Sequence, residues 1–125
     1  MRKLLTIIVA VLLLSCTSTK TYEDVSAEEA YEMIKKNPNV VVIDVRSEEE
    51  YRRGHIDGAI NIELSLNFER DVAKLDKNST ILVYCNTGLK SRVAAELLVR
   101  VGFKRVYNLV GGIKEWEARG LPVVK

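Results

Sequence analysis

The chain has 125 residues, of which 47% are hydrophobic and 29% are charged, and it contains seven glycines and two prolines. This length suits one globular domain, and the composition excludes a disordered or low-complexity chain. The 19 basic and 17 acidic side chains nearly cancel, which argues against nucleic-acid binding, where a basic excess is expected.

A secretory signal peptide is predicted for residues 1–15. Residues 1–3 form a basic head, and residues 4–14 are apolar apart from one threonine. These 11 residues are too few to span a bilayer, which takes about 20, but they suit the apolar region of an export signal. Removal of the segment leaves 17 basic and 17 acidic side chains, so the remaining chain has no formal net charge.

The next residues indicate a lipid anchor. The sequence LLSC at residues 13–16 resembles the lipobox of bacterial lipoproteins. The resemblance implies cleavage before Cys16, lipid on its thiol as the contact with a membrane, and a domain held at the bacterial cell envelope that faces the periplasm or the exterior. Thr17 is not the aspartate associated with inner-membrane retention, which favours the outer membrane in a Gram-negative cell. Residues 16–21 are polar and suit a tether. The alternative is an ordinary signal peptide with an incidental cysteine.

From residue 22 onwards helices and strands alternate, which predicts one domain over residues 22–125. The predicted helices cover residues 26–36, 47–50, 66–75, 91–101 and 113–118. The predicted strands cover residues 40–45, 59–62, 80–85 and 106–109. Capping-box patterns at Ser26 and Ser47 place the first two helix starts, and the first and third strands are apolar runs typical of buried parallel strands. The alternation indicates an α/β domain with a mainly parallel central sheet flanked by helices.

Cys85 stands at the end of the third predicted strand, with a helix expected to start near Ser91. Ligands of open α/β sheets collect at the carboxyl ends of strands, and a loop that curls into a helix N-terminus aims several amides at one point. A thiolate there is stabilised, and the thiolate is the reactive form. Gly88 supplies the backbone freedom that the loop needs. On this context alone, Cys85 packing at the strand end remains an equally open interpretation.

Three segments resemble the rhodanese-type sulfurtransferases. YCNTGLKS at residues 84–91 resembles their active-site loop, a cysteine followed by two variable residues, a glycine, one more residue, a basic residue and a serine. Residues 42–62 resemble the N-terminal signature of the family, with Asp-Val-Arg, Glu-Tyr and Gly-His-Ile in order. Residues 102–123 are similar to its C-terminal signature. Together they imply a three-layer rhodanese-like domain over nearly all of residues 22–125.

The resemblance implies a sulfurtransferase in which Cys85 accepts a sulfane sulfur from thiosulfate or a persulfide and passes it to a thiol or cyanide. Such covalent catalysis has two steps and ping-pong kinetics. The residues that would bind the substrate and cradle the charged persulfide are Asn86, Thr87, Gly88, Leu89, Lys90 and Ser91. Lys90 stands where many family members carry arginine, and it keeps the positive charge but lacks the planar fork. We expect a monomer that needs no cofactor.

Two other functions share parts of this pattern. Phosphatases and arsenate reductases on the same scaffold use Cys-x5-Arg, whose arginine forks onto two oxygens. In that register the arginine position holds Ser91, and Arg92 lies one residue further, which argues against this class. The other alternative is a non-catalytic rhodanese-like binding or sensing module, and the intact Cys85 argues against it.

The remaining signature residues are assigned to structure. Asp44 and Arg46 end a buried strand in a region that is largely scaffold in the family, although the resemblance also allows Asp44 to approach the active site. Arg46 is expected to pair with Glu50. His55, the only histidine, lies in a Gly-His-Ile turn and is expected to be structural rather than part of a Cys–His dyad. One histidine and one free thiol are too few for a zinc site, so no metal is expected.

Overall fold

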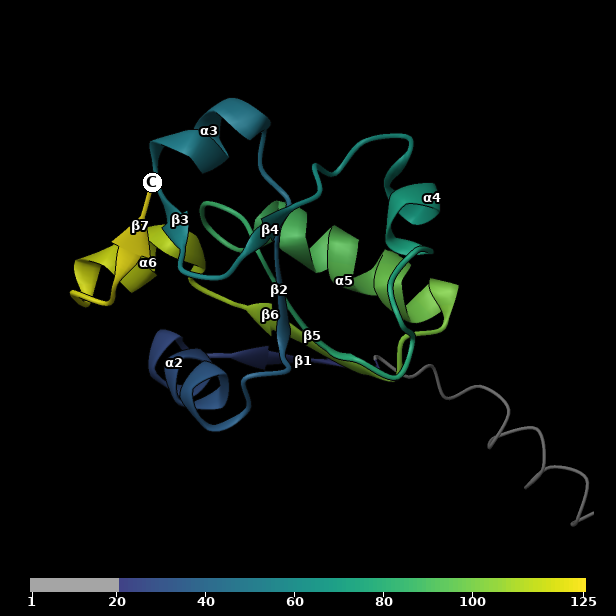
Figure 1. Cartoon of the computed structure of the whole chain (residues 1–125), viewed down its shortest axis with the longest axis horizontal. Helices are drawn as coiled ribbons and strands as arrows, with labels where there is room; N and C mark the ends of the chain where they lie inside the picture. The colour runs from purple at the N-terminus through teal and green to yellow at the C-terminus, as the bar shows by residue number, and fades with distance from the viewer. Residues whose placement is uncertain (1–20) are drawn as a thin grey trace, which may run out of the picture.

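The computed structural model of the protein describes residues 21–125 (Figure 1). The predicted signal peptide, the predicted lipidation site at Cys16 and the tether up to residue 20 lie outside the described residues. Within residues 21–125, no helix is both long enough and apolar enough to cross a membrane.

A five-stranded sheet forms the centre of the domain, in the order β1-β6-β5-β2-β4 and with all neighbouring strands parallel. Its strands are β1 (Tyr22–Val25), β2 (Val41–Asp44), β4 (Ile60–Asn61), β5 (Thr80–Tyr84) and β6 (Arg105–Leu109). A separate antiparallel pair joins β3 (His55–Ile56) to β7 (Val123–Val124). The predicted α/β class with a mainly parallel central sheet is therefore confirmed.

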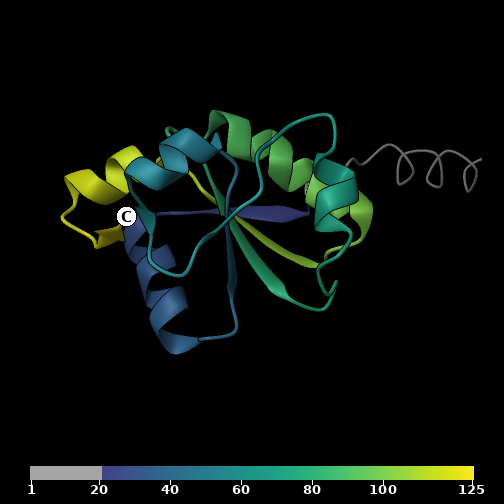
Figure 2. The same cartoon turned by 45° about the horizontal axis from the view of Figure 1, so that its top comes forward.

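Helices cover both faces of this sheet (Figure 1, Figure 2). Within residues 21–125 they are α2 (Ala27–Lys36), α3 (Glu48–Arg53), α4 (Phe68–Val72), α5 (Leu89–Val101) and α6 (Gly112–Ala118). Side chains alternate along β5, so Ile81 and Val83 join the core beneath α4 and α5. Leu82 and Tyr84 join the core beneath α2 and α6. A strand that is buried on both faces needs the continuous apolar sequence from which β5 was predicted.

The two capping boxes form as predicted. At the start of α2, Ser26 Oγ accepts from the Glu29 amide at 3.1 Å, and Glu29 Oε1 accepts from the Ser26 amide at 2.9 Å. Ser47 and Glu50 form the same reciprocal pair at the start of α3. Each box satisfies two amides that lack a partner within the helix, which determines where α2 and α3 begin.

Several parts of the fold differ from the sequence prediction, and the strands β3 and β7 are among those that were not predicted. The helix expected over residues 66–75 spans only Phe68–Val72, because Phe68 and Val72 are buried one turn apart whereas Leu66 is fully exposed. Strand β1 is absent from the prediction, since only its first and last residues, Tyr22 and Val25, are buried. Its sequence YEDV therefore shows neither the alternation nor the apolar run that marks a strand.

Candidate active site

The sulfur of Cys85 faces backbone amides at the carboxyl end of β5. Cys85 is 3% exposed, and its Sγ accepts hydrogen bonds from the amides of Gly88 at 3.2 Å and Ser91 at 3.3 Å. Residues 85–88 form the loop between β5 and α5, named the Cys85 loop below. Gly88 allows the loop to curl, because its φ of +96° lies in the left-handed region that favours glycine. The turn from strand to helix thus places amide donors around the thiol.

Helix α5 starts at Leu89, earlier than the start near Ser91 that the sequence predicted. Gly88 precedes the first helical residue, and no side chain caps the helix. The Ser91 hydroxyl does not cap the helix. It donates to Asn108 Oδ1 at 2.6 Å and accepts from the Cys85 thiol at 3.3 Å. Ser91 therefore lies in the first turn of α5, and its amide reaches the sulfur from there.

The pKa of the Cys85 thiol is lower than that of an ordinary cysteine. Burial of the sulfur on its own raises this pKa, because a charge is less stable away from water. The amides of Ser91, Gly88 and Thr87 donate hydrogen bonds that stabilise the thiolate and lower the pKa. Cys85 is therefore more readily ionised than a free cysteine, and the thiolate is the nucleophilic form.

The turn between β6 and α6 packs tightly against the Cys85 loop. The amide of Ile113 donates to the Cys85 carbonyl at 2.9 Å, and the amide of Lys114 donates to the Asn86 carbonyl at 3.2 Å. A Cβ atom on Gly112, whose φ is +66°, would lie 2.2 Å from the Asn86 carbonyl oxygen. Only glycine fits at this position. Because Gly112 has no side chain, α6 can approach the Cys85 loop closely enough to hold its backbone through these hydrogen bonds.

A buried ion pair lies beside the loop. Arg46 donates to both carboxylate oxygens of Asp44, with Nη2 2.8 Å from Oδ2 and Nε 3.0 Å from Oδ1. The expected pairing of Arg46 with Glu50 is wrong. Glu50 accepts from Ser47 at the start of α3 and from Asn86 Nδ2 at 2.7 Å. Arg46 Nη1 donates to Asn86 Oδ1 at 3.3 Å. Arg46 and Glu50 therefore hold the side-chain amide of Asn86 at its oxygen and at its nitrogen.

These contacts also set the charges beside the thiol. The hydrogen bond from Asn86 lowers the pKa of Glu50 and outweighs the opposite effect of burial. Burial lowers the pKa of Arg46, but the hydrogen bonds and charge of Asp44 outweigh burial and raise it. At neutral pH, Glu50 is therefore a carboxylate and Arg46 is a cation, and the Asp44 carboxylate balances the Arg46 charge.

A cleft of about 240 Å³ opens at the sulfur. It is lined by Arg46, Glu50, Cys85, Asn86, Thr87, Leu89 and Lys90. Among the residues predicted to bind substrate, Gly88 and Ser91 are buried, where they contact the sulfur and do not line the cleft. Arg92 is exposed on α5 and does not line the cleft either. The cleft therefore differs from that of a Cys-x5-Arg enzyme, in which an arginine forks onto the bound oxyanion.

Three residues near the thiol were not predicted to act in the site. Arg46 and Glu50 line the cleft, and Asn108 bonds to the Ser91 hydroxyl. Arg46 follows β2, which is the neighbour of β5 in the sheet, and the carboxyl ends of parallel strands lie at one edge. Asn108 is 1% exposed within the apolar strand β6. A polar residue between apolar residues of a predicted strand is the signal that could have identified it.

His55 makes its contacts with the α3–β3 turn. Its ring stacks on Tyr51, with ring centroids 3.7 Å apart, and its Nδ1 lies 2.8 Å from the Tyr51 carbonyl oxygen. In β3, the His55 backbone pairs with Val124 of β7. These contacts are those of a residue that holds a turn, and they agree with the structural interpretation of the Gly-His-Ile sequence.

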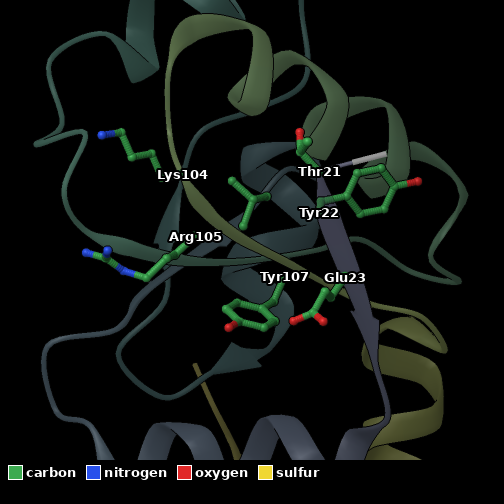
Figure 3. A pocket seen from close by; sticks show the side chains of 7 residues that line it. Thr21, Tyr22, Glu23, Lys104, Arg105 and Tyr107 are labelled. Atoms are coloured by element: carbon green, nitrogen blue, oxygen red, sulfur yellow. The ribbon is translucent and has the colours of Figure 1, made fainter. Parts of the chain in front are cut away.

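A second hollow, of about 230 Å³, lies where β1 and β6 begin (Figure 3). It is lined by Thr21, Tyr22, Glu23, Lys104, Arg105, Val106 and Tyr107. The amino ends of parallel strands lie at the edge of the sheet opposite to their carboxyl ends, where Cys85 is found. This hollow is therefore separate from the cleft and holds none of the residues predicted for the site.

A thiol at the carboxyl end of a parallel strand, with amides directed at its sulfur and a cleft beside it, is an arrangement suited to covalent catalysis through cysteine. Comparison with known proteins specifies the class. Residues 26–119 match the Rhodanese-like domain family. The chain therefore belongs to the rhodanese family of sulfurtransferases, and the resemblance seen in its three segments is confirmed.

Individual relatives agree with this membership. The chain is similar to thiosulfate sulfurtransferase GlpE of Coxiella burnetii, with 38% identity over 97 residues that cover 78% of this chain and 89% of the relative. It is similar in structure to the polysulfide-sulfur transferase homodimer of Wolinella succinogenes, with a TM-score of 0.71, 30% identity, and coverage of 83% of this chain and 79% of that one. The Alr3790 protein of Anabaena gives a TM-score of 0.74 at 28% identity, with 80% of each chain covered.

Proposed function

We propose that the protein is a sulfurtransferase that carries a sulfane sulfur as a persulfide on Cys85. The single observation behind this proposal is the position of the Cys85 sulfur, at an open cleft and with the amides of Gly88 and Ser91 directed at it. Membership of the rhodanese family supports the proposal, as do relatives named for thiosulfate and polysulfide sulfur transfer.

The reaction has two half-reactions. In the first, the Cys85 thiolate attacks the outer sulfur of thiosulfate or of a persulfide donor. A new S–S bond forms on Cys85 while the original bond to that sulfur breaks, and its electron pair leaves with sulfite or with the donor thiolate. In the second, cyanide or an acceptor thiolate attacks the outer sulfur of the Cys85 persulfide, and Cys85 leaves as a thiolate. The shared covalent intermediate predicts ping-pong kinetics.

Lys90 is the residue that we assign to attract an anionic donor. The amides of the Cys85 loop face the negative charge of the persulfide, but they carry no net charge. Of the charged side chains at the cleft, Glu50 is an anion and Arg46 is balanced by Asp44. Lys90 therefore contributes the cation that favours thiosulfate, as a point charge without the two-pronged contact of arginine.

Mass spectrometry of the purified protein tests this function. Incubation with thiosulfate should add one sulfur atom to the peptide that contains Cys85, and cyanide should then remove that sulfur as an equal amount of thiocyanate. Cys85→Ser is the matched control and should form neither product. Thiocyanate production by this variant would refute the mechanism. An unmodified Cys85 after thiosulfate, polysulfide and organic persulfide would instead favour a non-catalytic binding module.

We also propose that the protein is exported and anchored by lipid on Cys16. The apolar tract at residues 4–14 and the LLSC sequence that ends at Cys16 support this proposal. In bacteria fed labelled palmitate, the label should enter the wild-type protein and should be absent from Cys16→Ala. An unlabelled wild-type protein would remove the proposed anchor without affecting the proposed chemistry at Cys85.

A further inference from the structure

A chain of polar contacts runs from the edge of the sheet to the Cys85 sulfur. Strand β1 pairs with β6 in a register that places Asp24 beside Asn108, and Asn108 Nδ2 donates to Asp24 Oδ1 at 3.0 Å. Ser91 Oγ donates to Asn108 Oδ1 at 2.6 Å, and the Cys85 thiol donates to Ser91 Oγ at 3.3 Å. Ser91 is fully buried and Asn108 is 1% exposed, so water does not substitute for the contacts that Ser91 makes with Asn108 and Cys85.

The chemistry of Asp24 determines the direction of every hydrogen bond in this chain. A carboxylate only accepts hydrogen bonds, so the Asn108 side chain must turn its NH₂ group towards Asp24. The amide oxygen of Asn108 is then the atom that faces Ser91. Because a serine hydroxyl has a single hydrogen, that hydrogen is used in the bond to Asn108, and Ser91 presents a lone pair to Cys85.

This orientation suits a thiol and not a thiolate. A thiol has a hydrogen to donate to the Ser91 lone pair, whereas a negatively charged sulfur needs a donor. The Ser91 hydroxyl can turn to the sulfur only by leaving Asn108, which would strand a buried carbonyl oxygen without a partner. The amides of Gly88 and Ser91 keep their direction in both states, so the side chain of Ser91 is the part of the site whose effect depends on Asn108.

We propose that Asn108, oriented by Asp24, is a positioning residue that holds the Ser91 hydroxyl away from the Cys85 sulfur and thereby restrains the reactivity of the free thiol. The biological role of this restraint rests on the proposed function, since Cys85 is the nucleophile of the proposed reaction. Its physical content is independent of sulfur transfer, because the free thiol exists before any donor binds. Asn108 sets the fraction of reactive thiolate through Ser91 and does not contact the donor.

The pH dependence of Cys85 alkylation by iodoacetamide, measured on the full chain, tests this role. Asn108→Leu keeps a similar volume and frees the Ser91 hydroxyl to donate to the sulfur. The midpoint of the alkylation profile should fall by about one pH unit, which is the effect of one hydrogen bond to a charged group. When Ser91 is already alanine, Asn108→Leu should cause no further shift, because the residue through which Asn108 acts is gone.

Variants of the exposed Asp24 give a second route that leaves the buried core intact. Asp24→Ala removes the acceptor that orients Asn108, so the Asn108 amide is free to turn and the midpoint should fall in the same direction. Asp24→Asn is the matched control, because its side-chain oxygen still accepts from Asn108, and its midpoint should stay near that of the wild type. If Asn108→Leu does not fold, Asp24→Ala and Asp24→Asn together still test whether Asn108 restrains the thiol.

Other charged groups near Cys85 are unchanged in all these variants. They are Glu50 on α3, Arg46 with Asp44 at the end of β2, and Lys90 on α5. A midpoint that stays constant or rises in both Asn108→Leu and Asp24→Ala would overturn the proposal. So would a shift by Asn108→Leu that persists without the Ser91 hydroxyl. Because alkylation needs no sulfur donor, a protein that forms no persulfide would refute the proposed function and leave this result intact.

Discussion

Gly112 is a point of very close approach between α6 and the Cys85 loop, and Gly112→Ala tests how strictly this contact sets the site. The φ of Gly112 is +66°, and an added Cβ would lie 2.2 Å from the carbonyl oxygen and 2.4 Å from the carbonyl carbon of Asn86. Both atoms belong to the backbone, so no side chain can move to relieve the contact. The Asn86 peptide must shift, and the amides that face the sulfur must shift with it.

Gly120→Ala is the matched control for this substitution. Gly120 has a similar φ of +74°, but nothing lies within 4 Å of its added Cβ. The left-handed conformation alone costs about 1–2 kcal/mol for an alanine, and overpacking of a tight contact adds about 1–3 kcal/mol. Gly120→Ala should therefore lower the free energy of unfolding by about 1–2 kcal/mol, and Gly112→Ala by about 2–5 kcal/mol.

Urea unfolding measures this difference in stability, and thiocyanate formation under folding conditions measures the site. Gly120→Ala should keep a rate near that of the wild type. Gly112→Ala should lose about tenfold or more, since loss of a single amide donor to a developing negative charge has at least this effect. Equal losses of stability and of activity in the two variants would show that the contact at Gly112 does not position the loop, and the reasoning would be refuted.

Other predictions concern the charges of the site. Lys90→Ala should raise the KM for thiosulfate more than the KM for an uncharged trisulfide, and equal changes would contradict an electrostatic role. Asp44→Asn leaves Arg46 buried without its counter-charge and should lower the free energy of unfolding in urea by about 3–5 kcal/mol. Glu49→Gln, at an exposed ion pair, should change it by less than about 1 kcal/mol, and similar losses in the two would contradict the burial argument. The alkylation rate of Cys85 should fall as the pH drops through its lowered pKa, and a midpoint at or above about 8.5, the value of an ordinary cysteine, would contradict stabilisation by the amides.

Local sequence patterns were sufficient for the elements whose boundaries depend on neighbouring residues. The capping boxes placed the starts of α2 and α3, because the two partners lie three residues apart. The apolar runs placed β2 and β5, because both strands are buried on two faces. Cys85 belongs to this group as well, since the strand, the glycine and the helix that surround the sulfur are consecutive in the sequence.

Contacts between distant residues were beyond such patterns. Strand β1 is recognisable only through its register with β6, which joins Asp24 to Asn108 across 84 positions. The choice of partner for Arg46 is a similar case. Both Asp44 and Glu50 are carboxylates near Arg46 in the sequence, and Glu50 bonds to Asn86, which is 36 positions further along the chain. The polar network behind and beside the thiol therefore needed the tertiary structure.

In the active-site sequence, Gly88 and Ser91 are positions at which the structure restricts which side chain can be present. Gly88 is required by its φ of +96° and because an added Cβ would lie 2.1 Å from the Val110 carbonyl oxygen. Ser91 is required because its hydroxyl is buried between the Cys85 thiol and Asn108. Thr87 supplies the sulfur with an amide, which any residue except proline can donate. The surroundings of the Cys85 sulfur therefore depend mainly on backbone amides and on the buried residues Gly88 and Ser91, and they do not require the exposed side chain of Thr87.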